Sequence, residues 1–178
     1  MLALSWPGWA KPVHFDITEA LLKKSRDRHW VALEPVYFKL SIPDNRRDWL
    51  RVSRPFTVQQ RRLLACYWYI EEIESGGHHQ FFANEGILCP EVEAGFREME
   101  LTGVVQVLMD AKKILGLPEP ADVHQTRKRL ESLPLHAFRA LDDRLSRLNS
   151  KDEVWKSLDI YVSKHRQAFR FQGTVNIP

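Results

Sequence analysis

The segment from Val58 to Ser75 contains neither glycine nor proline and runs directly into the pair Gly76-Gly77. Its centre, Leu63 to Ile70, is an unbroken apolar run, and a helix that is apolar on every side belongs in the middle of a fold. Thr57 is a suitable N-cap for this helix, and a glycine can adopt the left-handed backbone that ends one. We therefore predict a mainly α fold, a single helical domain around a buried central helix.

The rest of the chain is expected to arrange itself around that helix. With 178 residues, the chain has the size of one domain. We predict a helical domain at residues 56–178, with residues 1–55 as an N-terminal extension packed on it. Four of the six tryptophans lie in this extension, where we expect them to anchor it, although such rings also stack on bases or sugars. They are Trp6, Trp9, Trp30 and Trp49.

Two segments with a period of two predict a small β-ribbon. Residues Val36 to Ile42 alternate apolar and polar side chains, which is typical of a half-buried strand. The tail from Phe169 to Ile177 alternates in a similar way, and we expect it to pair with the first segment. Ahead of the first segment, a helix is expected from His14 to Arg28, capped by Asp16 or Thr18.

Further helices are expected after the glycine pair. Pro90 suits the first turn of a helix, Asp122 is a suitable cap, and Ser150 with Glu153 matches a capping box. The predicted helices are Glu91 to Leu101, Val104 to Leu115, Asp122 to Leu130, one along the apolar stripe from Leu135 to Leu148, and a last one ending near His165.

Charged and polar residues gather around Gly76-Gly77, which we call the corner. Three glutamates crowd the last turn before it, where the helix dipole already places negative charge, so either solvent screens them or they face a cationic group. Gln80 and Asn84 share one helical face, and they either satisfy free backbone groups at the helix end or bind the backbone of a partner. Phe81 and Phe82 are expected in the core. The candidate binding residues are Glu71, Glu72, Glu74, His78, His79, Gln80 and Asn84.

Two parts of the sequence carry a family resemblance. The first is Tyr69-x-x-Glu72-Ile73-Glu74-Ser75-Gly76-Gly77-His78-His79-Gln80-Phe81-Phe82-Ala83-Asn84-Glu85-Gly86, and the second is Leu141-Asp142-Asp143-Arg144 followed by Leu158-x-x-Tyr161-Val162 and Phe169. Together, over roughly residues 57–170, they resemble a family of bacterial domains of unknown function that includes a DNA-mimic protein. Ser75 stands where that family has Asn, and His78 where an aromatic residue is usual. The resemblance implies an all-α body and, for the one member, non-enzymatic mimicry of DNA.

The charge distribution limits how far this mimicry carries over. DNA presents one negative charge per roughly 1.7 Å of its axis, whereas this chain has 26 Lys and Arg against 23 Asp and Glu, a net charge of +3. Only residues 56–116 are acidic, with five Lys or Arg against nine Asp or Glu. That segment holds the corner, which indicates either ordinary solvated helix faces or a local acidic surface for a basic partner.

Signals for a metal, a cofactor or a nucleophile are weak. His78 and His79 are adjacent, so on a helix they point about a third of a turn apart, and no His-x-x-x-His spacing occurs. We therefore predict no metal and no cofactor. Cys66 lies in the apolar run and is expected to be inert, whereas Cys89 precedes Pro90 in a predicted loop and is expected to be more accessible, with nothing nearby in sequence to activate it.

The N-terminus and the cysteines indicate the compartment. The first residues have no basic start and are interrupted by Pro7, Gly8 and Lys11, so we expect neither a signal peptide nor a membrane span. Neither cysteine belongs to a Cys-x-x-Cys pair. We predict a cytoplasmic protein that does not associate with membranes.

Three functions remain open on these residues. The first is a non-enzymatic protein-interaction module that uses the acidic corner to contact a protein partner or a second copy of itself. The second is a nucleic-acid-associated regulator that binds DNA, RNA or a DNA-binding protein; the chain has no helix-turn-helix or zinc pattern, and direct binding of nucleic acid is not expected. The third is an uncharacterised enzyme, which requires a concave pocket that joins Glu72, His79 and Gln80.

Overall fold

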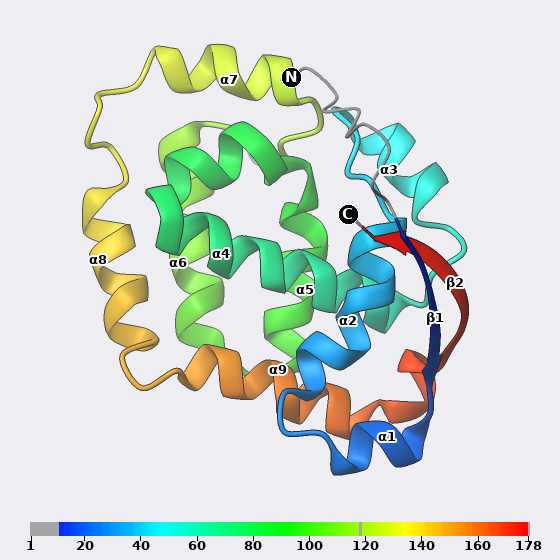
Figure 1. Ribbon diagram of the computed structural model, residues 1–178. Coiled ribbons are helices and arrows are strands. Elements are labelled where there is room, and N and C mark those ends of the chain that lie inside the picture. Colours follow the sequence, from blue (N-terminus) through cyan, green and yellow to red (C-terminus); the bar gives the residue numbers. More distant parts are fainter. Residues whose placement is uncertain (1–10, 118, 178) are drawn as a thin grey trace.

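The structure is a computed structural model that describes residues 11–117 and 119–177. Its helices and strands are β1 (Lys11–Ile17), α1 (Glu19–Lys24), α2 (Arg28–Lys39), α3 (Arg46–Val52), α4 (Val58–Glu85), α5 (Cys89–Glu98), α6 (Thr102–Leu115), α7 (Val123–Glu131), α8 (Arg139–Leu148), α9 (Glu153–Lys164) and β2 (Phe171–Ile177). Short 3-10 turns at Gly86–Leu88 and Arg166–Phe169 precede α5 and β2. The prediction of a mainly α fold with a small ribbon from the N- and C-terminal segments is confirmed (Figure 1).

Helix α4 is the buried centre of the fold, as its sequence predicts. The Thr57 hydroxyl accepts a hydrogen bond from the backbone N–H of Gln60 at 3.1 Å, and the Gln60 side chain accepts one from the backbone N–H of Thr57 at 2.9 Å. This reciprocal capping box satisfies two backbone donors that have no partner within the helix.

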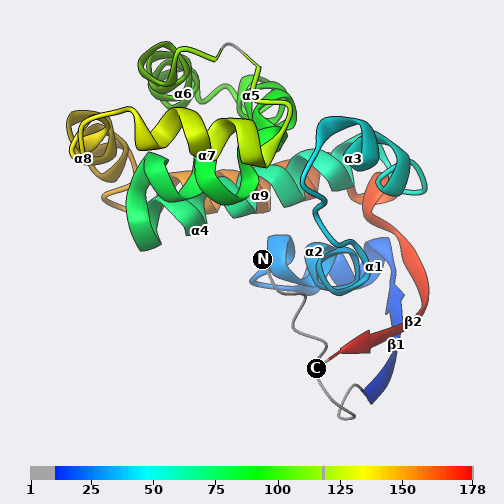
Figure 2. The same cartoon turned by 90° about the horizontal axis from the view of Figure 1, so that it is seen from above.

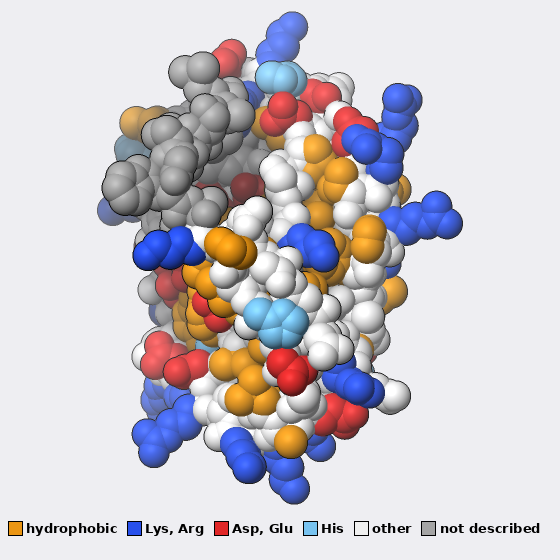
Figure 3. All heavy atoms as spheres, turned by 45° about the vertical axis from the view of Figure 1, so that its right-hand side comes forward, with side chains coloured by type: hydrophobic (Ala, Val, Ile, Leu, Met, Phe, Trp, Pro, Cys, Tyr) orange, Lys and Arg blue, Asp and Glu red, His pale blue; other side chains and the backbone are white. Residues whose placement is uncertain are grey.

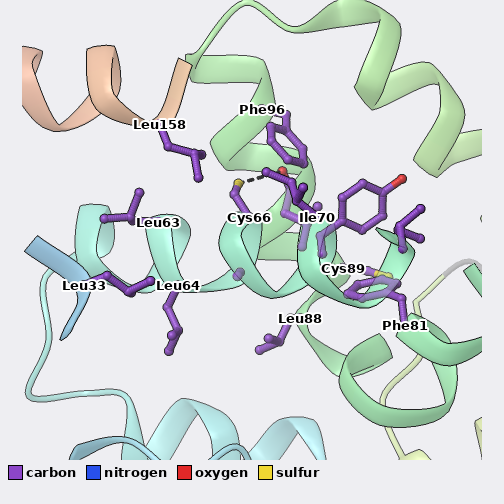
Figure 4. Close-up of a cluster of buried hydrophobic side chains, with 14 of the residues drawn as sticks. Leu33, Leu63, Leu64, Cys66, Ile70, Phe81, Leu88, Cys89, Phe96 and Leu158 are labelled. Carbon is purple, nitrogen blue, oxygen red and sulfur yellow. Dashed lines mark hydrogen bonds between the residues drawn. The ribbon is translucent and has the colours of Figure 1, made fainter. Parts of the chain in front are cut away.

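Neighbouring helices cover α4 on several sides. Figures 1 and 2 show it between α2 on one side and α5 with α6 on the other. In the close-up of Figure 4, Leu33 of α2 lies beside Leu64, while Phe96 of α5 and Leu158 of α9 lie on the side of Cys66. All five side chains are almost completely removed from solvent, which makes this the core that the apolar run predicts.

Helix α4 bends sharply at the corner. Gly76 (φ −158°, ψ 15°) and Gly77 (φ 75°, ψ −175°) leave helical geometry, and the helix resumes with His78. The second half folds back on the first, because the rings of Tyr69 and Phe81 lie 4.9 Å apart, centroid to centroid. The predicted bend of the central helix at the glycine pair is therefore present.

The ribbon is present, but its N-terminal strand lies elsewhere than predicted. Strand β1 pairs antiparallel with β2, so that His14 lies opposite Thr174. The strand predicted at Val36 to Ile42 is wrong, since most of that segment is the end of α2. Val36 and Leu40 are both buried and lie four residues apart, which is helical spacing. An alternation this short does not distinguish the period of a strand from that of a helix.

The helix predicted from His14 to Arg28 is wrong in its first part. Residues 13, 15 and 17 face inward and alternate with exposed neighbours, which is the pattern of a strand. The helix α1 starts only after Thr18, one of the two predicted caps, whose hydroxyl accepts a hydrogen bond from the backbone N–H of Leu21 at 3.1 Å.

The helices predicted after the corner are present as α5 to α9, with three local corrections. The helix predicted from Leu135 to Leu148 begins only at Arg139, and Leu135 lies before it and is exposed. The capping box of Ser150 and Glu153 is absent; instead, the Asn149 side chain accepts a hydrogen bond from the backbone N–H of Val154 at 3.1 Å. Cys89 does not lie in a loop, because it is the first residue of α5 and is fully buried.

The N-terminal elements pack on the helical body. Trp49 of α3 is fully buried and donates its indole N–H to Glu91 at 3.1 Å, and Trp30 of α2 packs half-buried against the core. Trp6 and Trp9 lie outside the described residues. Among the helices of the described residues, none combines the length and apolarity needed to cross a bilayer.

Candidate functional site

The corner is built on a backbone conformation that requires glycine. Gly77 has φ 75° and ψ −175°, a region essentially closed to residues with a side chain. A Cβ atom at Gly77 would also lie 2.6 Å from Oδ2 of Asp142, which belongs to α8. The second glycine therefore both turns the chain and lets a carboxylate approach the turn.

Asp142 holds the start of the second half of α4. Its Oδ1 accepts hydrogen bonds from the backbone N–H of His78 at 2.9 Å and from Nδ1 of the same residue at 2.5 Å. An ionised carboxylate can only accept hydrogen bonds, so Nδ1 of His78 carries a proton. The other ring nitrogen of His78, Nε2, forms a hydrogen bond of 2.9 Å with the Tyr69 hydroxyl. Partial burial raises the pKa of Asp142, but the hydrogen bonds from His78 outweigh burial and hold it below its ordinary value.

Asp142, His78 and Tyr69 have the order of groups in which a histidine activates a hydroxyl, but only Asp142 reaches the surface. His78 and Tyr69 are fully buried, and burial raises the pKa of the Tyr69 hydroxyl well above its ordinary value. The His78 ring stacks on Phe138, with centroids 6.1 Å apart and 27° between the planes. These residues fix the corner and tie α4 to α8.

Two of the three glutamates before the corner meet neutral hydrogen-bond donors. Glu72 is buried and accepts a hydrogen bond from the side chain of Asn84 at 2.9 Å. Glu74 is exposed and accepts one from Asn149 at 2.8 Å and one from the indole of Trp155 at 3.2 Å. Among the described residues, neutral amide and indole groups rather than a cation therefore hold these carboxylates at an unfavourable helix end.

The third glutamate, Glu71, is half-buried and lies near the tyrosines of α2 and α4. The pKa of Tyr67 is raised to about 12, mainly by burial and secondly by the negative charge of Glu71. The same two causes raise the pKa of Tyr37. Glu71 thus points to the α2 side of the molecule.

The remaining predicted site residues do not converge. His79 is exposed, and the half-buried Gln80 lies over Gly76, where a Cβ would be 2.1 Å from its Oε1. Glu72 is directed to Asn84 instead. The structure therefore brings Glu72 and Asn84 together, but does not join Glu72, His79 and Gln80.

A cavity of about 420 Å³ lies beside the corner, between α4, α8 and the start of α9. We call it the corner cavity. Four acidic residues line it, Glu74, Asp142, Asp143 and Asp152, and no Lys or Arg is among its lining residues. Its buried apolar lining consists of Ile70, Ile73, Leu145 and Val154. The cavity therefore combines negative charge with an apolar surface.

Sequence reasoning found only Glu74 among these acidic residues. The segment Leu141-Asp142-Asp143-Arg144 was part of the family resemblance, but nothing in the sequence placed it against the corner. Residue spacing cannot reveal such a contact, because Asp142 lies 64 positions from His78 along the chain.

The geometry joins the same two sequence segments that carry the family resemblance. A family model described as "DMP19-like protein" matches residues 54–165. The chain belongs to this DMP19-like family. No match was found among the curated proteins or among the solved structures.

The DMP19-like region contains the whole corner and Asp142, and it leaves the β-ribbon outside. It also contains Glu85, at the end of α4, which sequence reasoning missed. Burial, and then the nearby charge of Glu72, raise the pKa of Glu85 to about 7. Its buried Oε2 atom has no hydrogen-bond partner among the described residues.

The described part of the DMP19-like protein offers no group of three or more His, Cys, Asp or Glu side chains arranged to hold a metal ion. The acidic residues at the corner are divided between the corner cavity, which Glu74, Asp142, Asp143 and Asp152 line, and the interior, where Glu72 is buried. Chemically, the accessible part of this site can accept cationic and hydrogen-bond-donating groups.

Proposed function

We propose that this DMP19-like protein is a non-enzymatic protein-interaction module and that the corner cavity receives a basic side chain of its protein partner. This proposal changes which acidic residues of the corner are expected to contact the partner. Glu72 and His78 are buried and serve the fold, whereas Glu74 faces the cavity together with acidic residues of α8 and the start of α9.

The lining of the corner cavity supports a lysine or arginine as its occupant. Such a side chain lays its aliphatic stem on an apolar surface and directs its charged end to carboxylates. The cavity supplies both surfaces. Asp143 is exposed, and no described residue donates a hydrogen bond to its carboxylate, so that carboxylate has free capacity for a partner.

A broad mimicry of DNA receives less support. On the ribbon side of the molecule, Lys and Arg side chains stand among Asp and Glu rather than apart from them (Figure 3). The net charge of +3 also opposes an acidic surface that extends over the whole protein. The acidic feature is local, which fits recognition of one basic segment.

The two other functions fit the site less well. Carboxylates in the corner cavity repel the phosphates of a nucleic acid. The group that most resembles catalytic machinery, His78 with Tyr69 and Asp142, has its histidine and tyrosine fully buried. A reaction at that place has no open route for substrate.

The test is binding of a lysine- and arginine-rich peptide to the full chain, followed by fluorescence anisotropy at increasing salt. We expect binding that weakens with salt, and we expect Asp143→Lys to weaken it by about tenfold, equivalent to about 1.4 kcal/mol. Glu131→Lys is the matched control, because Glu131 is an exposed acid of α7 that does not line the cavity. It should leave binding unchanged.

The same variants are then compared in pull-downs with the tagged chain, with co-purified proteins identified by mass spectrometry. A partner lost with Asp143→Lys and kept with Glu131→Lys supports the proposal. Equal binding by the two variants, or equal binding of a peptide in which glutamine replaces every basic residue, overturns it.

A further inference from the structure

Among the residues that the structure describes, strand β2 has a free edge. It pairs with β1 on one side, and the sheet has only these two strands within the described residues. No backbone hydrogen bond from another described segment reaches Phe171–Ile177. In Figure 1, β2 forms the outer right-hand border of the molecule. One row of its N–H and C=O groups therefore has no partner within residues 11–117 and 119–177, which is the condition for pairing with another strand.

This edge lacks the usual protection against such pairing. Edge strands are normally blocked by charged side chains or proline. The inner partner β1 contains Lys11, Pro12 and Asp16, whereas β2 reads Phe-Gln-Gly-Thr-Val-Asn-Ile, without a charge or a proline.

The side chains of β2 are arranged symmetrically about Thr174. Gln172, Thr174 and Asn176 are exposed on the outer face of the ribbon. Phe171, Val175 and Ile177 lie on the inner face, toward α2, and are more buried. Seven residues with this alternation can meet a second copy of themselves in antiparallel register without exchanging the two faces.

We propose that β2 is the dimerisation edge of this protein: two copies pair β2 with β2 antiparallel, with Thr174 opposite Thr174 on a two-fold axis. The result is a four-stranded sheet in the order β1-β2-β2-β1. This register places Gln172 opposite Asn176 on the outer face. On the inner face it places Phe171 opposite Ile177 and Gly173 opposite Val175, so every pair is polar with polar or apolar with apolar or glycine.

A second copy fits this edge better than an unrelated extended peptide does. Cross-strand pairs of threonine and of amides are favourable, and like charges placed opposite each other are not. The register about Thr174 places threonine opposite threonine and amide opposite amide, and it places no like charges opposite each other. A two-fold interface of this kind also closes on itself after two copies, which avoids open-ended growth of the sheet.

The first test measures the mass of the full chain in solution by sedimentation equilibrium. We expect a dimer for the wild type and monomers for Thr174→Lys and for Thr174→Glu, because each variant meets its own charge across the axis. Mixing the two variants should restore the dimer, since opposite charges then face each other, and this restoration excludes loss of folding as the cause. His14→Lys is the matched control, because it adds a charge to the same outer face on β1, opposite Thr174 and away from the free edge.

The second test fixes the register by cross-linking. Thr174→Cys should form a disulfide-linked dimer on mild oxidation, whereas Gln172→Cys or Asn176→Cys alone should not. A mixture of those two variants should cross-link, because the proposed register places residue 172 opposite residue 176. The natural thiols are buried and leave the background low.

The dimer proposal is overturned by a monomeric wild type, by a dimer that survives Thr174→Lys, or by the absence of cross-links at residue 174. An edge that instead binds an extended peptide while the chain stays monomeric also overturns it. These outcomes are independent of the corner cavity, whose binding test uses other residues.

Discussion

Replacing Gly77 by alanine tests the structural role of the corner. The change adds one methyl group at a position with φ 75° and ψ −175°. It also places that methyl carbon 2.6 Å from Oδ2 of Asp142, well inside the closest ordinary contact. Either the backbone or the Asp142 side chain has to move.

The expected cost follows from these two conflicts. Holding a non-glycine residue in such a backbone region costs about 1–3 kcal/mol. Moving Asp142 weakens its charge-assisted hydrogen bonds to His78, which are worth about 1.5–3 kcal/mol. Alanine offsets roughly 0.4–1 kcal/mol by restricting the unfolded chain. We therefore expect Gly77→Ala to lower the free energy of unfolding by about 3 kcal/mol and the Tm by roughly 6–12 °C.

The measurement is equilibrium urea unfolding, followed by far-UV circular dichroism and tryptophan fluorescence. Gly76→Ala is the matched control. Gly76 has φ −158°, which other residues adopt. Its added methyl would lie 2.1 Å from Oε1 of Gln80, whose amide end can rotate away, and 2.9 Å from Cβ of Gln80, a contact that a small backbone shift relieves. We expect Gly76→Ala to cost less than about 1 kcal/mol.

Equal costs for the two alanine variants would falsify this account of the corner. A double variant with Asp142→Ala separates the two conflicts. Removing the carboxylate relieves the contact and leaves the backbone strain, so the Gly77→Ala cost should be smaller in that background. An unchanged cost there would show that Asp142 plays no part.

Two further predictions concern buried groups. Because the pKa of Glu85 is raised from 4.5 to about 7, the folded state holds this proton more tightly than the unfolded chain does, and stability should fall as the pH rises between those values. Glu85→Gln should abolish that fall, and above pH 7 its free energy of unfolding should exceed that of the wild type by up to about 3 kcal/mol. Urea unfolding at several pH values measures this difference. A pH profile of stability that is the same in the variant and the wild type contradicts the prediction. Cys66 and Cys89 are buried, and burial raises the pKa of both thiols, so both should react with a thiol reagent such as Ellman's reagent only after unfolding; rapid reaction of the native protein would count against the buried placement.

Much of the fold could be read from the sequence because its signals are local. The N-cap at Thr57, the apolar run after it and the glycine pair at its end each depend on neighbouring residues. Burial of Phe81 and Phe82 follows from the same helix pattern and is confirmed. These features led directly to a central helix with a bend.

The N-terminal segment shows where local signals are ambiguous. The strand β1 and the end of α2 both contain short alternations of apolar and other residues, and the sequence analysis chose the wrong one. What decides between them is tertiary. Strand β1 needs the C-terminal tail as its partner, while Val36 and Leu40 need one helical face to reach the core.

The amino-acid sequence by itself determined the helical class, the position of the central helix and the place of its bend, because periodicity, caps and glycine act over a few residues. Only the tertiary structure decided which corner residues are available for binding. It buries His78 and Glu72, and it brings Asp142 from a distant helix to the bend. The physical reason is that burial and long-range hydrogen bonds depend on which surfaces meet in space, and spacing along the chain does not encode that.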